Sequence, residues 1–495
     1  MLKRGFSSEL EKIRIQLSYV LRCRRVEPRE GERIMTVELR TYTMKVLQGD
    51  MMTPISVYQS LEGKHKMLFE SSAKHEESGR YSFIAVNPIA ELFGDRDGYT
   101  FTRDLHIEKG SENVLAKLKQ VMPFHQEHYP FAFFGGAIGF FGYETAFYTE
   151  RIGEYLQDDL EMPDVHIFFY DTFIVFDHLK QEITLAAIDL FADGRSLEEM
   201  EEEITRIEEQ LYAGATFKEM QLGELNFKPI LAKEQFIALV ERAKQHILKG
   251  DIFQIVLSQR FTSSFTGNPF ALYRQLRTSN PSPYMFYMDY GTYTILGTSP
   301  ESLVKVKDRK VTTNPIAGTK PRGQTEDQDH AIAEGLLNDE KEIAEHRMLV
   351  DLGRNDLGRI SKIGTVKLVK YMNIERYKHV MHIVSEVIGE LHEDVHVLDV
   401  LRACLPAGTV SGAPKIRAMQ LINELEPVKR GVYAGAVGYI STTGDMDLAL
   451  AIRTMIIKDQ SAHVQAGAGI VYDSVPLSEY EETLNKARAL LEVKK

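Results

Sequence analysis

Two pairs of glutamates in this sequence could bind a divalent cation. Glu342 and Glu345 are three residues apart in a stretch that reads as an acidic helix, and Glu479 and Glu482 repeat this spacing near the C-terminal end. Residues three apart lie on one face of a helix, so each pair would present two carboxylates together. Mg²⁺ prefers oxygen ligands and leaves coordination positions for a substrate's own oxygens. The sequence therefore predicts that two acidic helices together hold a magnesium ion.

The same acidic residues have a second explanation, which is the start of helices. Asp339 precedes Glu342 with a capping-box-like spacing, and Ser478 precedes Glu481 with the usual serine form of that motif. Carboxylates in a first helical turn also interact favourably with the helix dipole. For either glutamate pair taken alone, helix capping and metal binding both stay open.

Arg453 and three glycine clusters indicate where an anion could bind. Arg453 is flanked by apolar residues on a predicted strand, so it should either meet a carboxylate in a structural ion pair or reach a cleft. The clusters at 135–139, 408–415 and 467–469 lack the spacing of a P-loop or a dinucleotide fingerprint, which disfavours ATP and NAD. Their backbone amides could approach an anion because no Cβ stands in the way, although ordinary tight turns explain them equally.

Composition indicates a globular protein with a sizeable core. The 495 residues suffice for two or three domains or for one large intertwined unit. The net charge of -12 argues against a general nucleic-acid or anionic-membrane binder. No apolar run approaches the roughly 20 residues that span a bilayer. The two cysteines, Cys23 and Cys404, form no C-x-x-C motif, so a disulfide framework and a thiolate metal site are not expected and a cytoplasmic location fits. We interpret Cys404 as a buried residue at a helix end, not as an amidotransferase nucleophile.

The elements that must position these residues divide the chain into four parts. Residues 1–34 mix arginines with glutamates, which fits neither a transit peptide nor a secretory signal, and we interpret them as a loosely ordered tail. Residues 35–212 alternate strand-like runs with turn signals and close with an amphipathic helix at 195–211. Periodicity is lost over 213–229, the predicted linker, and 230–495 forms the remaining part. The strand-like runs of the first part are 36–39, 81–86, 166–170 and 173–176.

The last part is expected to open with a helix over 233–249 that Gly250 ends as a C-cap, followed by a strand over 252–258. Further strands are expected at 293–297, 432–440 and 463–472, and helices at about 327–351, 397–404, 413–425 and 478–492. Runs of strands broken by separate helices favour an α+β fold over strict β-α-β alternation.

Four stretches, in this order, resemble the motifs of the chorismate-binding enzymes: Thr313 to Thr319, Glu345 to Asp356, Thr409 to Lys415 and Gln465 to Val471. The likeness is strong over about 230–490 and weaker over 50–190. The resemblance implies the large layered sheet-and-helix fold of the chorismate-utilising enzymes. It also implies that 35–212 is a regulatory, tryptophan-binding part packed on the catalytic part at 230–495.

Two positions indicate which reaction of that family to expect. Isochorismate and salicylate synthases have, at the position of Gln254, a lysine that activates water, and a neutral glutamine cannot serve as that base. Aminodeoxychorismate synthases of the folate pathway have a nucleophilic lysine at the position of Ala317. The resemblance therefore implies formation of anthranilate and pyruvate from chorismate and ammonia, the first step of tryptophan biosynthesis. Aminodeoxychorismate synthesis is the alternative, and a binding regulator without catalysis is the alternative from another class.

The resemblance also assigns roles to single residues. Glu345 and Glu482 would be direct Mg²⁺ ligands supported by Glu342 and Glu479, so that the ion fixes the ring carboxylate of chorismate. The catalytic positions would be Glu301, as the proton donor to the leaving hydroxyl, His382, which is tied to pyruvate elimination, and Thr319. The substrate contacts would be Gln254, Ala317, Gly318, Thr409, Tyr433, Arg453, Gly467, Ala468, Gly469 and Lys486.

A partner and an inhibitor follow from the same resemblance. Ammonia would come from a separate glutamine amidotransferase subunit. Leu68 to Ser71 resembles the family's segment for feedback inhibition by tryptophan, and Asn280 to Met285 its second wall, although Phe69 replaces the usual leucine. The residues expected to contact tryptophan are Ser71, Pro283, Tyr284 and Met285.

Overall fold

The computed structural model describes residues 41–71, 79–125, 129–214, 220–376 and 380–492. The predicted tail at 1–34, the strand expected at 36–39 and Cys23 lie outside these ranges.

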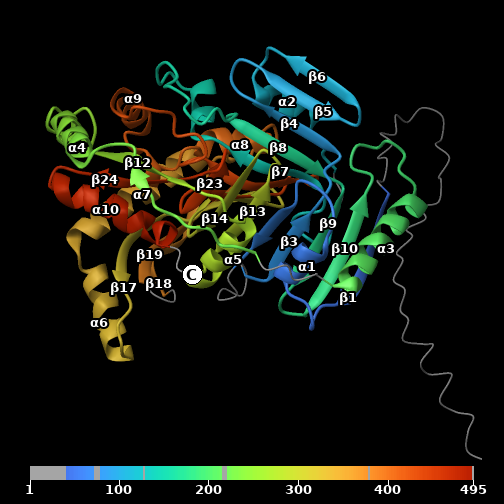
Figure 1. The fold of residues 1–495 in the computed structure, drawn as a ribbon. Coiled ribbons are helices and arrows are strands. Elements are labelled where there is room, and N and C mark those ends of the chain that lie inside the picture. The colour runs from blue at the N-terminus through green and yellow to red at the C-terminus, as the bar shows by residue number, and fades with distance from the viewer. Residues whose placement is uncertain (1–40, 72–78, 126–128, 215–219, 377–379, 493–495) are drawn as a thin grey trace, which may run out of the picture.

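Two sheets of antiparallel neighbours form the framework (Figure 1). Sheet A runs in the order β1 (Tyr42–Gln48), β10 (Glu182–Ile188), β9 (Thr172–Asp177), β3 (Tyr81–Ala85), β2 (Met67–Glu70), β13 (Tyr284–Asp289), β14 (Tyr293–Ser299), β23 (Thr454–Lys458), β24 (Ser461–Ile470), β12 (Gln254–Ser264) and β11 (Lys228–Pro229), with β20 (Gly412–Ala413) also paired to β12. Sheet B runs β17 (Ile316–Pro321), β19 (Val380–Glu390), β16 (Lys310–Thr313), β15 (Ser302–Lys307), β22 (Met446–Leu450), β21 (Ala436–Ser441), β7 (Gly136–Phe141), β8 (Val165–Tyr170), β4 (Ala90–Gly94), β5 (Tyr99–Arg103) and β6 (His106–Gly110), with β18 (Lys367–Arg376) also paired to β19. The expected α+β class is confirmed.

Both parts of the chain contribute strands to both sheets. In sheet A, β2 of the first part pairs with β13 of the second, and in sheet B, β7 pairs with β21. The predicted linker at 213–229 therefore does not separate one sheet from the other, and its last two residues form β11 of sheet A. The sheets match the alternative of one large intertwined unit, and the assignment of 35–212 to regulation and 230–495 to catalysis stays a prediction.

The core has two layers because sheet A is covered on both faces. Along β9, Phe173 and Val175 belong to the core between the two sheets, whereas Ile174 and Phe176 belong to a second core on the outer face of sheet A. Alternate residues of a strand point to opposite faces, so a strand apolar at every position must be covered twice. Helices α1, α3, α5 and α10 bring their apolar faces to this outer core.

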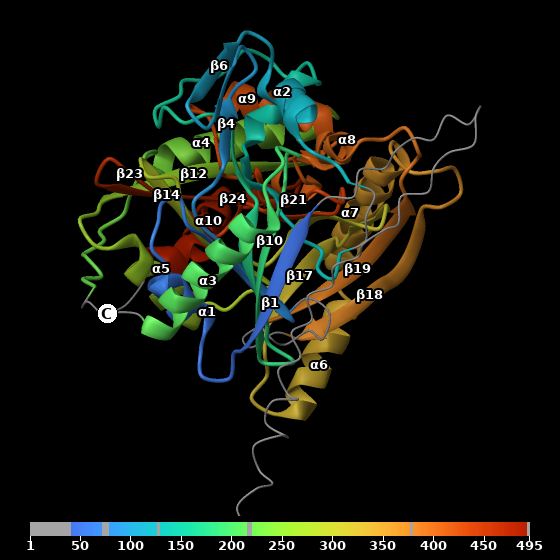
Figure 2. The same cartoon turned by 90° about the vertical axis from the view of Figure 1, so that its right-hand side faces the viewer.

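The helices are α1 (Pro54–Ser60), α2 (Val114–Val121), α3 (Leu197–Ala213), α4 (Lys233–Leu248), α5 (Pro269–Ser279), α6 (Glu326–Leu337), α7 (Glu340–Gly358), α8 (Val397–Cys404), α9 (Lys415–Leu425) and α10 (Pro476–Leu491), with 3₁₀ turns η1 (Tyr143–Tyr148) and η2 (Gly408–Val410). In Figure 2, α7 and β17 to β19 lie on one side of the molecule and α1, α3 and α5 on the other. Helix α10 packs on α4 and β24, and α7 packs on β17 and β19. Among the residues described, no helix is long and apolar enough to cross a bilayer.

Three local expectations were wrong. The helix expected over 327–351 is two helices, because Asn338 closes α6 and Asp339 caps α7 by accepting from the Lys341 and Glu342 amides. Ser478 does not cap α10, which begins at Pro476, where proline is preorganised for a first turn. Arg453 is not on a strand: it lies in the connection between β22 and β23 with a φ of 51°.

Candidate active site

Glu301 and Thr409 meet between sheet B and the 3₁₀ turn η2. Glu301 directly precedes β15, and its Oε1 accepts a hydrogen bond of 2.8 Å from Thr409 Oγ1. Burial raises the pKa of the Glu301 carboxyl to about 7, while the Thr409 hydroxyl and the charge of Lys486 oppose this rise. A carboxyl with that pKa holds a proton near neutral pH and can also release it, which suits a general acid. Two residues expected in the site are thus brought together.

Gln254 is the first residue of β12, and its side chain contacts the acidic helix α7. Its Nε2 donates to Glu345 Oε1 over 3.3 Å, whereas its Oε1 is buried with no hydrogen-bond partner among the described residues. Gly469 makes room for this side chain, because a Cβ at Gly469 would lie 2.9 Å from Gln254 Nε2. Gln254 also pairs with Ala413, within the third family motif.

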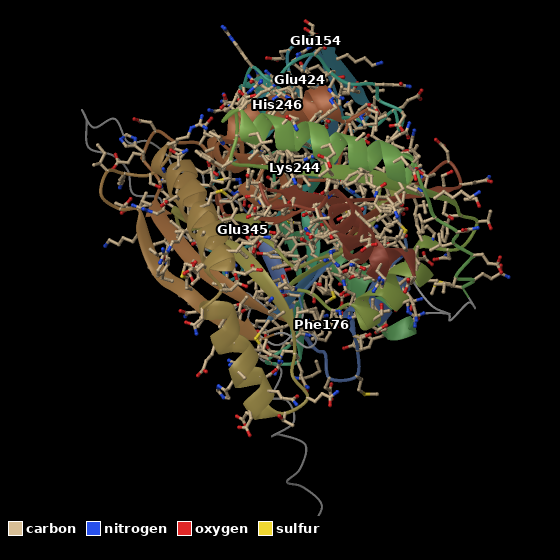
Figure 3. The ribbon with its side chains drawn as sticks, turned by 90° about the vertical axis from the view of Figure 1, so that its left-hand side faces the viewer. Glu154, Phe176, Lys244, His246, Glu345 and Glu424 are labelled. Atoms are coloured by element: carbon tan, nitrogen blue, oxygen red, sulfur yellow. The ribbon has the colours of Figure 1, made fainter. Side chains whose placement is uncertain are left out.

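The two glutamate pairs lie on α7 and α10, as expected. In Figure 3, Glu345 lies on the side of α7 that faces the middle of the molecule. Burial and the neighbouring charge of Glu345 raise the pKa of Glu342, and burial raises the pKa of Glu479, to which the charge of Glu482 adds. Lys341 lowers both of these pKa values, so α7 and α10 are close enough for one lysine to act on a carboxylate of each. Asp339 caps α7, so capping explains part of its acidic start, and metal binding by Glu342 and Glu345 stays a prediction.

This donor set fits a magnesium ion that shares its coordination with a substrate. Within the described ranges, no three His, Cys, Asp or Glu side chains converge closely enough to hold a metal by themselves. Mg²⁺ is commonly held by one or two carboxylates together with substrate oxygens and water, so a full protein cage is not required. Burial is the main cause of the raised pKa values of Glu342 and Glu479, and the charges of Glu345 and Glu482 add to it. A bound divalent cation would favour the ionised form of these carboxylates.

Arg453 is a partly buried cation that forms no ion pair with the described side chains. Burial lowers the pKa of its guanidinium, the Tyr433 hydroxyl opposes this, and no described side chain forms an ion pair with it. The β23 to β24 pairing ends with Met455 opposite Val464, so Arg453 lies just beyond the end of that ladder. Partial burial of a guanidinium without an ion pair carries a cost, and a ligand carboxylate would offset that cost. The cleft alternative for Arg453 is therefore favoured over a structural ion pair.

The Gly467 to Gly469 segment lies between Tyr433, near Gly467, and Gln254, near Gly469. The three residues of this segment pair with β12, while β23 no longer covers the other edge of β24 beyond Val464. A Cβ at Gly467 would lie 2.7 Å from the Tyr433 hydroxyl, so a larger residue would displace that ring. The start of this stretch is thus close to Tyr433, one of the two side chains expected to bind the carboxylate.

His382 and Thr319 lie opposite each other on neighbouring strands of sheet B. Their strands β19 and β17 place them opposite one another, and Thr319 Oγ1 lies 3.0 Å from His382 Nδ1. Burial lowers the pKa of His382, which keeps the imidazole neutral near pH 7. Ala317 and Gly318 precede Thr319 on β17, and a Cβ at Gly318 would lie 3.1 Å from Glu342 Oε2. The first motif is therefore adjacent to α7, the helix that carries Glu342 and Glu345.

Lys486 lies one helical turn beyond Glu482 on α10. Its Nζ pairs with Glu482 Oε1 at 2.7 Å, and its charge lowers the pKa of both Glu301 and Glu479. This cation therefore acts on the proposed acid and on the acidic pair of α10 together.

The four residues expected to contact an inhibitor line one cavity between the sheets. Ser71, Pro283, Tyr284 and Met285 border a space of about 80 Å³ whose other walls include Phe83, Val437 and Tyr439. Ser71 Oγ is buried without a hydrogen-bond partner in the described part of the chain, and Tyr284 donates to Asp447 Oδ1 over 3.0 Å. Lys305 pairs with the same Asp447 at 3.2 Å. Lys305 and Asp447 carried no signal in the sequence, because only the fold brings β15 and β22 to this cavity.

Sequence reasoning also missed His346, which fixes helix α7 to sheet B. His346, within the second motif, is fully buried and its Nε2 lies 2.6 Å from Ser385 Oγ on β19. Burial lowers the pKa of His346 to about 4, so it is neutral and structural. Cys404 is buried with its thiol pKa raised by burial to about 12, in agreement with the prediction that it is no nucleophile.

The two large antiparallel sheets with their covering helices match solved structures of chorismate-utilising enzymes. The family model described as chorismate binding enzyme matches residues 64–492. The chain therefore belongs to the chorismate binding enzyme family.

Relatives agree with this membership. The chain is 46% identical over 453 residues to anthranilate synthase component 1 of Lactococcus lactis, covering 91% of this chain and 99% of that protein. It is 45% identical to the Aquifex aeolicus protein of the same name, covering 89% and 92%. The crystal structure of anthranilate synthase component I from Streptococcus pneumoniae superimposes with a TM-score of 0.79 at 47% identity, covering 90% of this chain and 99% of that one. The isochorismate synthase MenF of Escherichia coli shares the fold, with a TM-score of 0.68 at 20% identity.

Proposed function

We propose that this chain is the aminating component of an anthranilate synthase, which converts chorismate and ammonia to anthranilate and pyruvate in the first step of tryptophan biosynthesis. The observation that carries the proposal is the neutral Gln254 amide in contact with Glu345. An amide at this position cannot deprotonate water, and Ala317 supplies no lysine nucleophile on β17. The relatives at 45% to 46% identity bear the matching name.

Two sets of residues hold the substrate in this proposal. Arg453 and Tyr433 bind the enolpyruvyl carboxylate through charge-assisted hydrogen bonds, with the amides of 467–469 beside them. Glu345 and Glu482, with Glu342 and Glu479 in support, hold Mg²⁺ near the ring carboxylate. When bound, this ion neutralises the carboxylate and withdraws electrons from the ring.

Proton transfer belongs to Glu301 and His382. Hydroxide leaves poorly at neutral pH, so Glu301 protonates the ring hydroxyl as ammonia adds, and its pKa of about 7 makes that proton available. The neutral imidazole of His382, beside Thr319, accepts a proton as pyruvate is eliminated and the ring becomes aromatic. Lys486 and Thr409 limit the rise of the Glu301 pKa.

Ammonia comes from a separate glutamine amidotransferase subunit in this proposal, because Cys404 is too deeply buried and too weakly acidic to attack glutamine. The cavity at Ser71 and Met285 binds tryptophan as a feedback inhibitor. The low cysteine content fits a reducing cytoplasm.

The test uses the purified chain with chorismate, an ammonium salt and Mg²⁺ at mildly alkaline pH. Fluorescent anthranilate and one equivalent of pyruvate are expected, with none formed after chelation of the metal or in a Glu345→Gln variant. A product that retains the enolpyruvyl group by mass would instead identify an aminodeoxychorismate synthase component. Turnover of glutamine by the isolated chain would contradict the separate subunit.

A further inference from the structure

Arg430 lies in the connection between α9 and β21, and none of the roles above includes it. The residue is only 2% exposed, and its guanidinium forms a two-pronged pair with Glu426: Nε donates to Oε2 over 2.8 Å and Nη2 to Oε1 over 2.6 Å. Glu426 Oε1 also accepts from the amide and the hydroxyl of Ser258 on β12. The pair is thus fixed to sheet A.

The remaining donors of Arg430 reach the backbone of elements that carry substrate residues. Nη1 donates to the Val410 carbonyl over 2.7 Å, directly after Thr409. Nη2 donates to the Val256 carbonyl over 2.8 Å, two residues after Gln254 on β12. One planar group therefore bridges η2 and β12, next to the backbone bond of 2.9 Å from the Val256 amide to the Ser411 carbonyl.

The faces of the same guanidinium contact aromatic rings. It lies 5.6 Å from the centroid of the Tyr433 ring and 4.8 Å from that of Tyr143. The Tyr433 amide also donates to the Arg430 carbonyl over 3.3 Å. Tyr433 is thereby the third proposed substrate residue in or next to a segment that contacts Arg430.

Residues from the first part of the chain contact the turn formed by Lys429, Arg430 and Gly431. Glu144 accepts hydrogen bonds from the amides of Arg430 and Gly431 over 2.9 and 3.0 Å. Lys429 pairs with Asp164 at 3.0 Å and with Asp158 at 3.1 Å. The backbone of the turn is therefore fixed independently of the Arg430 side chain, which leaves that side chain to act on its neighbours.

We propose that Arg430 is a positioning residue for the reaction, because its hydrogen bonds set Thr409, Gln254 and Tyr433 relative to one another. A purely structural ion pair would need only Glu426, whereas here two donors go to carbonyls beside substrate residues. Lysine keeps the charge but lacks the planar fork, so it cannot serve the carboxylate and both carbonyls together. Misplacement of substrate groups by about 1 Å costs up to about 100-fold in rate. The inference rests on the proposed function.

The experiment compares wild type and Arg430→Lys in the ammonium assay, with melting temperature and the pH dependence of kcat/KM measured on both. We expect the KM for chorismate to rise and kcat to fall, each about tenfold, at a temperature where the variant is folded. We also expect the high-pH decline of activity to move upward, because a displaced η2 weakens the Thr409 bond to Glu301.

A matched control is Arg195→Lys. Arg195 also pairs with two carboxylates, Asp171 at 2.6 Å and Glu203 at 2.7 Å, on elements without proposed substrate residues. It should lower the melting temperature while the KM and the pH profile stay at wild-type values.

A folded Arg430→Lys variant with wild-type KM and pH profile overturns the inference, even if it melts earlier. If that variant does not fold, Glu426→Gln is judged by the same two measurements, because it weakens the pair and keeps the shape. Wild-type protein that forms no anthranilate in the same assay would refute the proposed function instead.

Discussion

Thr409 donates to Glu301 across 2.8 Å, and this bond joins two segments more than 100 residues apart. It stabilises the carboxylate form of Glu301 while burial opposes it, so the carboxyl pKa comes to about 7. The protonation of the proposed acid therefore depends on the position of η2.

The first prediction concerns Thr409→Val, which keeps the shape and removes the donor. The pKa of Glu301 should rise by about one unit, so the high-pH decline of kcat/KM, plotted against free ammonia, should move upward by the same amount. Thr319→Val alters the contact with His382 and not the one with Glu301, so it should leave the pH of this decline unchanged. An unchanged profile in Thr409→Val would show that Glu301 is not the acid.

The second prediction concerns the stability cost of the same carboxyl. The folded protein holds the Glu301 proton more tightly than the unfolded chain, where the pKa is 4.5, so the contribution of this carboxyl to stability falls as pH rises from 4.5 to about 7. Glu301→Gln should therefore abolish most turnover and raise the free energy of unfolding at pH 8 by about 1 to 2 kcal/mol. Denaturant titrations of wild type and Glu301→Gln at pH 8 and pH 4 measure the free energy of unfolding, and the difference between the two proteins should vanish at pH 4.

The third prediction uses the contact between Gln254 and Glu345. Gln254→Lys places an ammonium group beside this carboxylate, where it competes with a cation. The Mg²⁺ concentration for half-maximal activity should rise about tenfold, as is typical when partners of metal ligands change. Gln254→Met, of similar length and without charge, should shift it much less. Equal Mg²⁺ requirements in the lysine variant and wild type would remove Glu345 from the ligand set.

The fourth prediction concerns inhibition by tryptophan. Ser71 Oγ lines the cavity beside Met285 without a hydrogen-bond partner in the described structure, so Ser71→Ala should weaken inhibition about tenfold through loss of one hydrogen bond to the ligand. The uninhibited kcat and KM should stay the same. Ser60→Ala, at the end of α1 away from the cavity, is the control. Identical inhibition curves for wild type and Ser71→Ala would place the inhibitor elsewhere.

Local elements could be predicted because their signals are local. Helix α8 has the expected bounds of 397–404, and α4 ends beside Gly250, whose φ of 80° explains the stop. The misplaced cap at Ser478 and the missed break at Asn338 arose because capping residues resemble ordinary helix residues until the backbone is seen.

The sequence by itself determined the chemistry of the proposed site: acidic pairs at helical spacing, a glutamine in place of lysine at 254, and an alanine at 317. The acidic pairs follow from side-chain type and spacing, whereas the meaning of residues 254 and 317 followed from the resemblance to the chorismate-binding enzymes, and neither required knowledge of distant contacts. Only the tertiary structure decided that both parts of the chain share both sheets and that Thr409 faces Glu301. It also placed the Arg430 guanidinium between β12, η2 and Tyr433. The physical reason is that these are contacts between segments far apart in the chain, formed by strand pairing and burial, and no local pattern encodes which segments meet.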